Sequence, residues 1–175
     1  PVSASPFIVD FPMPDGSVQK FRVVNAPSME EGLAAKFPGI NSYAGIGVND
    51  PSANIRFDVS MHGVHATVLK GSNSAVYIDQ MYQNYYRVVR RSDMTDAPLN
   101  FECFTENFQN QMTNREGIEN NADDGKLRTY RLAMISGAEF SLHYIPAGGL
   151  PSLADSVAAV IAAQNSHVTR TNQVY

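Results

Sequence analysis

The side chains best suited to metal binding or to general base chemistry are four histidines. His62 and His65 are three residues apart in a hairpin context, where positions i and i+3 of extended backbone point to opposite faces, so a shared metal site is disfavoured there. His143 and His167 are isolated in the sequence, and we expect core or surface roles for them. No Ser-His-Asp order, phosphate-binding glycine loop or His-Glu-x-x-His motif occurs, so the residues of this chain do not by themselves predict an enzyme.

Cys103 is the single cysteine and therefore cannot form a disulfide within the chain. One interpretation is a small buried side chain in a strand, which is the usual role of a lone cysteine. The other is a thiolate that binds a metal supplied by another domain. The residues alone leave both interpretations open.

Composition sets limits on the class of protein. Hydrophobic residues make up 43% and charged residues 17%, values typical of globular chains. The net charge is −4, and Arg87, Arg90 and Arg91 form the one basic cluster, which we interpret as a solvated strand end, so a nucleic-acid partner is disfavoured. No run of about 18 apolar residues predicts a membrane span. The many Asn, Ser, Thr and Tyr residues favour an exported protein, secreted or at the cell surface.

The first part of the chain alternates short β-type segments with turns. Pro14-Asp15-Gly16 predicts a hairpin turn between strands at 7–11 and 18–24. A Ser28-x-x-Glu31 capping box predicts a short helix through Phe37. Four short strands separated by turn residues, at 42–48, 54–60, 64–69 and 75–79, predict an antiparallel meander. Residues 55–59 and 64–68 alternate apolar and polar side chains, so each of these two strands is expected to have one face on a core and one toward solvent. Two more strands are expected at 85–89 and 99–104.

The last part of the chain has a different character. Residues 106–126 are rich in Asn, Gln, Asp and Glu, which indicates an exposed linker. An apolar strand is expected at 129–135, followed by a helix with Ser152 as N-cap and Asp155 at the capping-box position. Its predicted apolar stripe consists of Leu153, Val157, Val160, Ile161, Gln164 and Val168. One strand and one helix cannot bury both of their faces, so we expect the chain to be a piece of a larger protein.

Several motifs resemble a known family. Leu-Arg-Thr-Tyr-Arg-Leu-Ala at 127–133, Gly-Ala-Glu-Phe at 137–140, His143 and the helix from 153 resemble the start of the catalytic domain of bacterial reprolysin-like (adamalysin-type, metzincin) zinc metallopeptidases. Upstream motifs resemble the propeptide of that family in order and spacing: Pro-Met-Pro-Asp-Gly-Ser at 12–17, Leu-Ala-Ala-Lys-Phe-Pro at 33–38, Tyr-Ala-Gly-Ile-Gly at 43–47 and Val-Tyr-Ile-Asp at 76–79.

The resemblance implies three regions. Residues 1–105 would be a β-rich pro-domain, 106–126 a linker with a processing site, and 127–175 the first strand and long helix of the protease, giving an α+β chain overall. The zinc-binding helix would lie after Tyr175, so zinc is expected in the downstream catalytic domain and no cofactor in this chain. Processing is expected between Asn114 and Lys126, at the exposed Asp123, Asp124, Gly125 and Lys126.

Within the resemblance, Cys103 becomes a candidate latency ligand to the zinc of the downstream domain, although Phe-Glu-Cys-Phe-Thr at 101–105 lacks the Gly that follows the cysteine in related eukaryotic switches. The expected function is a pro-domain that keeps an exported zinc metalloendopeptidase latent and assists its folding. The alternative is a β-rich extracellular binding or adhesion module. The expected partner is the remaining catalytic domain; without it, apolar residues such as Leu132, Met134, Val157, Ile161 and Val168 would favour a homodimer.

Overall fold

The structure is a computed structural model that describes residues 5–71, 74–95, 131–146 and 148–174. The described residues up to Thr95 and from Ser136 onward belong to one compact unit, whereas Arg131–Ile135 belong to a second unit. The division at residues 105 and 127 stays a prediction. None of the helices in the described part of the chain combines the length and the apolar character needed to span a bilayer.

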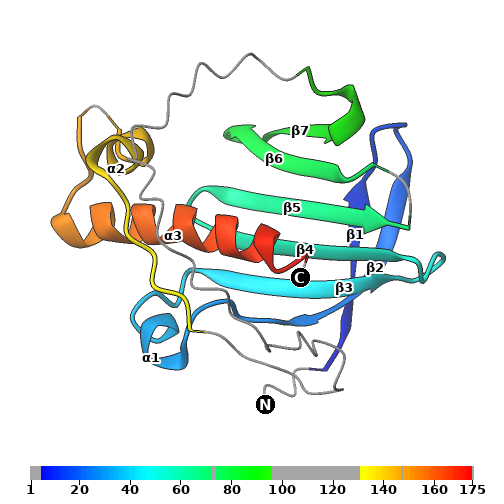
Figure 1. Cartoon of the computed structure of the whole chain (residues 1–175), viewed down its shortest axis with the longest axis horizontal. Helices are drawn as coiled ribbons and strands as arrows, with labels where there is room; N and C mark the ends of the chain where they lie inside the picture. The colour runs from blue at the N-terminus through cyan, green and yellow to red at the C-terminus, as the bar shows by residue number, and fades with distance from the viewer. Residues whose placement is uncertain (1–4, 72–73, 96–130, 147, 175) are drawn as a thin grey trace, which may run out of the picture. The chain divides into compact units, whose positions relative to one another are not determined.

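The meander predicted from the sequence is confirmed, and its strands belong to one antiparallel sheet of seven strands in the order β1 to β7 (Figure 1). Met13–Ser17 closes the first hairpin, with Gly16 at φ +82° as the turn requires. The strands are β1 (Phe7–Pro12), β2 (Val18–Asn25), β3 (Asn41–Gly47), β4 (Ala53–Ser60), β5 (Gly63–Lys70), β6 (Val76–Tyr82) and β7 (Tyr85–Arg90). A 3₁₀ turn, η1 (Arg91–Asp93), follows β7, and the strand expected at 99–104 lies outside the described residues.

The sheet curls so that one of its faces closes on itself. Phe11 of β1 and Phe57 of β4 have ring centroids 5.0 Å apart, although two strands lie between them. In a flat sheet the backbones of those strands would be about 14 Å apart, at about 4.8 Å per step. The curl therefore creates the hydrophobic core, which consists of Phe11, Phe21, Val23, Ala53, Ile55, Phe57, Ala66, Val68 and Ile78.

The capping box predicted at Ser28 is wrong. Helix α1 (Glu31–Ala34) has Glu30 at its N-cap position and no side-chain cap, and it ends before the predicted Phe37. The Ser28 hydroxyl instead lies 3.1 Å from the hydroxyl of Thr169, in the C-terminal helix. The Ser28 side chain, which the local pattern assigned to the cap, therefore makes a long-range tertiary contact instead.

The C-terminal part contains two helices, α2 (Ala138–Tyr144) and α3 (Leu153–Thr171). The predicted N-cap is confirmed, because the Ser152 hydroxyl accepts a hydrogen bond from the Asp155 amide at 3.1 Å. The strand predicted at 129–135 is wrong in its described portion, since Arg131–Ile135 have no strand pairing. A single extended segment forms a strand only when a neighbouring edge completes the ladder.

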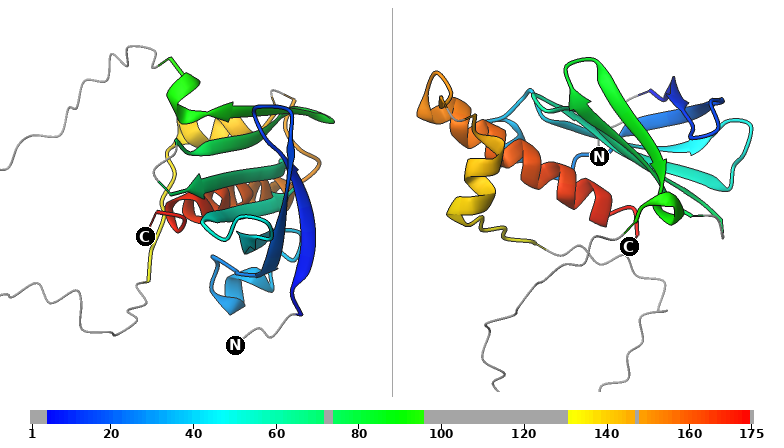
Figure 2. Two further views of the ribbon diagram at one scale, coloured as in Figure 1. Left: turned by 90° about the vertical axis from the view of Figure 1, so that its right-hand side faces the viewer. Right: turned by 90° about the horizontal axis from the view of Figure 1, so that it is seen from above.

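Helix α3 lies along the outer face of the sheet, over β4 and β5 (Figures 1 and 2). The residues that it buries are Ala159, Ala162, Ala163, Asn165 and Thr169. At about 100° per residue this set lies opposite the predicted apolar stripe. Leu153 and Val157 of that stripe are 81% and 43% exposed. The molecule is thus an α+β fold in which the long helix turns its small and polar side toward the sheet.

A candidate interface between the sheet and helix α3

A row of polar residues crosses five strands beneath α3. Ser42 pairs with Asp58, Asp58 with His65, His65 with Asp79, and Asp79 with Arg87, each on the neighbouring strand. Residues directly opposite each other in adjacent strands point to the same face of a sheet. We call this set the polar row. Ser42, Asp58 and Asp79 are all buried, so the face that the alternating pattern assigned to solvent is covered here.

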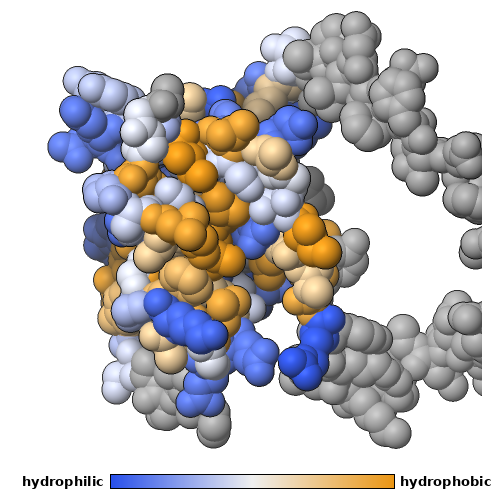
Figure 3. Space-filling model, turned by 90° about the vertical axis from the view of Figure 1, so that its left-hand side faces the viewer, coloured by the Kyte–Doolittle hydropathy of each residue, from blue (hydrophilic) through white to orange (hydrophobic). Residues whose placement is uncertain are grey.

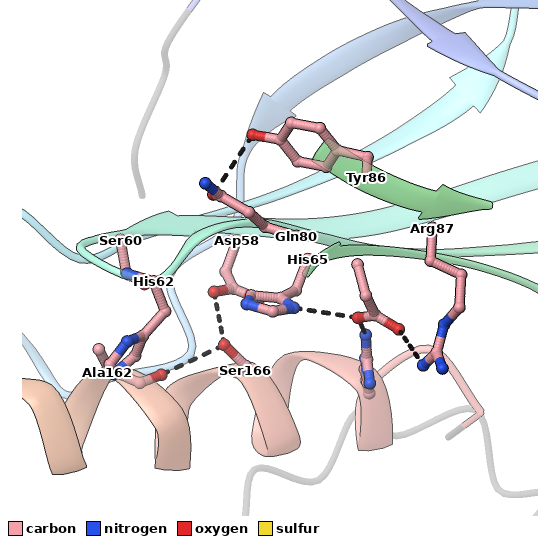
Figure 4. Close-up of polar contacts among 11 residues, drawn as sticks. Asp58, Ser60, His62, His65, Gln80, Tyr86, Arg87, Ala162 and Ser166 are labelled. Carbon is pink, nitrogen blue, oxygen red and sulfur yellow. Dashed lines mark hydrogen bonds and ion pairs between the residues drawn. The ribbon is translucent and has the colours of Figure 1, made fainter. Parts of the chain in front are cut away.

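The helix supplies matching hydrogen-bonding groups. The amide Nδ2 of Asn165 donates to the Ser42 hydroxyl at 3.0 Å, and the Thr169 hydroxyl lies 3.0 Å from the same oxygen. The Ser166 hydroxyl donates to Oδ2 of Asp58 at 2.7 Å, as Figure 4 shows. Because Asn165, Ser166 and Thr169 follow one side of the helix, they reach the row together.

Asp79 is the most highly connected group in the row. Its carboxylate accepts from Nδ1 of His65 at 3.0 Å, pairs with the guanidinium of Arg170 from α3, and lies 3.6 Å from that of Arg87. Burial alone would raise the pKa of Asp79, but the hydrogen bond from His65 and the charge of Arg170 lower it to about 2. Asp79 is therefore ionised at neutral pH and attracts three basic groups, one of them on the helix.

Asp58 has the opposite electrostatic setting. Burial raises the pKa of Asp58, and the hydrogen bond from Ser166 and the charges of His65 and Arg170 offset that only in part. Its second oxygen, Oδ1, is buried without a hydrogen-bond partner among the described residues. The interface thus contains one well-paired and one poorly paired carboxylate.

Three of the four histidines come together beside this row. His62, His65 and His167 line a small cavity of about 190 Å³ with Asp79, Tyr144 and Arg170. The expectation that His62 and His65 point apart is wrong, because His62 lies in the two-residue turn between β4 and β5, outside the strand. Its Nε2 donates to the carbonyl oxygen of Ala159 in α3 at 2.8 Å. His167 is exposed, within the core or surface role expected for it, and borders the same cavity.

The polar side chains that line the histidine cavity make contacts between the sheet and α3. The acceptors of the Ser166 hydroxyl among the described residues are the Asp58 carboxylate and the Ala162 carbonyl oxygen. Among the described residues no group of three or more His, Cys, Asp or Glu side chains is arranged to hold a metal ion. Burial and the nearby Arg170 charge lower the pKa of His167, consistent with a neutral imidazole beside a guanidinium. The arrangement can bind a helix through hydrogen bonds and ion pairs.

The same sheet face continues past the end of α3 as an apolar groove of about 760 Å³. Val24, Ala44 and Ile46 form its floor, and Arg22 and Arg56 lie along it. Neither arginine makes an ion pair within the described part of the chain. Asn172 and Gln173 close one end, and Nε2 of Gln173 donates to the Asn54 carbonyl oxygen at 3.1 Å.

No family model, curated protein or solved structure matches the chain. The functional interpretation therefore depends on the motifs of the sequence and on the contacts described above.

The residues that the sequence singled out for function have separate outcomes. Cys103 and the processing residues Asp123, Asp124, Gly125 and Lys126 lie outside the described residues. Sequence reasoning missed the polar row. The available signal was the sequence -Asn-Ser-x-x-Thr-Arg- at 165–170, polar residues on one side of a helix whose other side is aliphatic.

Proposed function

We propose that the chain is the pro-domain region of an exported zinc metalloendopeptidase, with the first helix of the protease attached. Residues before the linker would assist folding and keep the enzyme latent. The observation that supports this most directly is the set of side-chain contacts between the sheet and α3. Contacts from Ser42, Asp58, His62 and Asp79 all reach a helix that, in this proposal, belongs to the protease.

These contacts between the sheet and α3 suit a pro-domain that assists the folding of the protease. The long helix of an incomplete domain would otherwise expose both its apolar and its polar side, and a surface that binds the polar side orients the apolar side for later packing. Leu153 and Val157 point away from the sheet and are exposed at 81% and 43%. Viewed from the side where α2 and the start of α3 lie, apolar residues gather into a patch (Figure 3).

The test compares latency with and without the thiol. The parent protein, produced with residues 1–126 covalently attached, should hydrolyse a peptide substrate at least about tenfold more slowly than the protease matured near Leu127. Cys103→Ala should restore much of the activity if the thiolate occupies the zinc position needed by the catalytic water. Lys36→Ala, at an exposed site in the turn after α1, serves as the control.

Two results would contradict the proposal in different parts. Equal activity of the unprocessed and matured proteins would remove the latency function. Latency that is unchanged by Cys103→Ala would return Cys103 to the role of a core residue while leaving the pro-domain in place.

The alternative, an extracellular binding module, is favoured by one observation, the apolar groove with Arg22 and Arg56. An apolar floor beside two guanidinium groups that make no ion pair with another described residue suits a ligand with aliphatic and acidic parts. The reading frame after Tyr175 discriminates the two: a His-Glu-x-x-His-x-x-Gly-x-x-His helix supports the pro-domain, and further β-rich sequence supports the binding module.

A further inference from the structure

We propose that the polar row is a receptor surface for helix α3, so that the sheet and the helix form a releasable two-part complex once the chain between them is cut. The proposal deepens the pro-domain function, on which its biological meaning rests. Its physical content, a non-covalent complex between residues before and after the linker, concerns this chain alone.

Every contact that joins the two parts is distant in sequence. The pair Ser42–Asn165 spans 123 residues, Asp58–Ser166 spans 108 and Asp79–Arg170 spans 91. His62 adds its hydrogen bond to the Ala159 carbonyl across 97 residues. No backbone ladder joins α3 to the sheet, so the attachment depends on side chains rather than on chain continuity.

The composition of the contact is that of a separable interface. On the helix side, its fully buried aliphatic residues are alanines, at 159, 162 and 163. Alanine buries little apolar area, so at about 25 cal/mol per Å² the hydrophobic gain is small. Interfaces between separable partners are more polar than protein cores, and their specificity comes from matched hydrogen bonds and charges.

Removal of α3 would expose polar residues of the sheet to water and would leave the hydrophobic core of the sheet intact. The core cluster lies on the opposite, curled face and contains no residue of α3. The groups that α3 would uncover include Ser42, Asp58 and Asp79, which water can hydrate. On the released helix, Arg170, Ser166 and Asn165 would become exposed, and water can hydrate these side chains as well.

Arg170 is the selective element of this interface. It is the residue of α3 that brings a full positive charge to the row, and it pairs with Asp79, whose side chain is only 12% exposed. Loss of the guanidinium would leave the buried carboxylate with His65 and the more distant Arg87. The receptor is thus matched to a helix that presents small residues, an amide, hydroxyl groups and one arginine.

The experiment cuts the folded chain and asks whether the parts stay together. A recognition site for a specific protease is inserted after Asp124 in the 175-residue chain, the chain is cut to completion, and the product is passed over a size-exclusion column at neutral pH. The two pieces should co-elute. Arg170→Ala should weaken their association at least about tenfold, measured by dilution.

Arg90→Ala is the matched control, because Arg90 pairs with Asp93 next to the end of β7 and is not in the row; it should leave association unchanged. The uncut Arg170→Ala chain is examined by circular dichroism, so that loss of folding is separated from loss of binding. Separation or precipitation of the unmutated pieces, or co-elution unaffected by Arg170→Ala, would overturn the inference. Because no protease activity is measured, that failure is distinct from a failure of the latency test.

Discussion

Asp79 shows how a single carboxylate organises the contact between the sheet and α3. It accepts from His65 within the sheet and pairs with Arg170 from the helix, and its pKa is held at about 2. A carboxyl group whose folded pKa lies below its usual value stabilises the fold above the unfolded pKa and loses that contribution as the pH falls through the folded pKa. For Asp79 the affected window is about pH 4 to 2.

We therefore expect Asp79→Asn to lower the free energy of unfolding by about 2 kcal/mol at pH 7, the value that corresponds to a shift from 3.8 to about 2. The difference between the unmutated chain and the variant should shrink as the pH falls from 4 to 2, because the unmutated carboxylate becomes protonated. Urea unfolding at pH 7, 4 and 2.5 measures it.

Asp10→Asn is the matched control for this prediction. Asp10 also pairs with a cation, Lys20 at 3.0 Å, but both side chains are about half exposed. Exposed pairs contribute little, so the control should have a far smaller effect at every pH. A cost for Asp79→Asn no larger than that of the control would mean that α3 does not pair with this carboxylate in solution.

At the scale of elements, the orientation of α3 is the property that sequence reasoning could not supply. The start of the helix was predictable, because Ser152 and Asp155 form a local cap. The side that would face the sheet was not, since an aliphatic stripe normally predicts the buried side. Here the sheet offers Ser42, Asp58 and Asp79, and hydrogen-bonding groups on the helix match that surface better than valine or leucine would.

This orientation predicts an unusual ranking of substitutions. Val157→Ser on the outward stripe should change the free energy of unfolding by less than about 0.5 kcal/mol, because the site is exposed and the two residues have similar helix propensities. Ala162→Leu should cost about 1–3 kcal/mol, because Ala162 is fully buried against the sheet and has no room for three more carbons.

Urea unfolding of the two variants measures the ranking, and light scattering after size-exclusion chromatography reports the oligomeric state. The reverse ranking would indicate that the aliphatic stripe is the buried side in solution. If Val157→Ser were costly only at concentrations where the chain is a dimer, the homodimer expected from the sequence would be the structure that buries the stripe.

At the scale of the whole molecule, the sheet was largely predictable and its relation to the C-terminal helix was not. Turn residues and two-residue alternation fix the seven strands, because these signals are local. The curl that brings Phe11 to Phe57, and the reassignment of Ser28 from a cap to a partner of Thr169, depend on contacts between distant segments. For the same reason the convergence of His62, His65 and His167 on one cavity could not be inferred from their spacing.

The last prediction concerns where the molecule is divided. Residues 106–126 combine few aliphatic residues with many amide and acidic ones, a composition typical of exposed segments that proteases cut. If the pro-domain proposal holds, maturation should cleave between Asn114 and Lys126, and N-terminal sequencing of the mature protease should begin within that window. A start before Asn114 would carry the acidic segment into the enzyme, and one after Ala133 would remove the Leu-Arg-Thr-Tyr-Arg-Leu-Ala motif on which the resemblance rests. Either start would contradict the assignment of this segment as the processing site.

A start inside the window, together with a pro-domain that remains bound to the mature enzyme on a sizing column, would connect the cut to the polar row, because only non-covalent contacts such as Asp79–Arg170 would then hold the parts together.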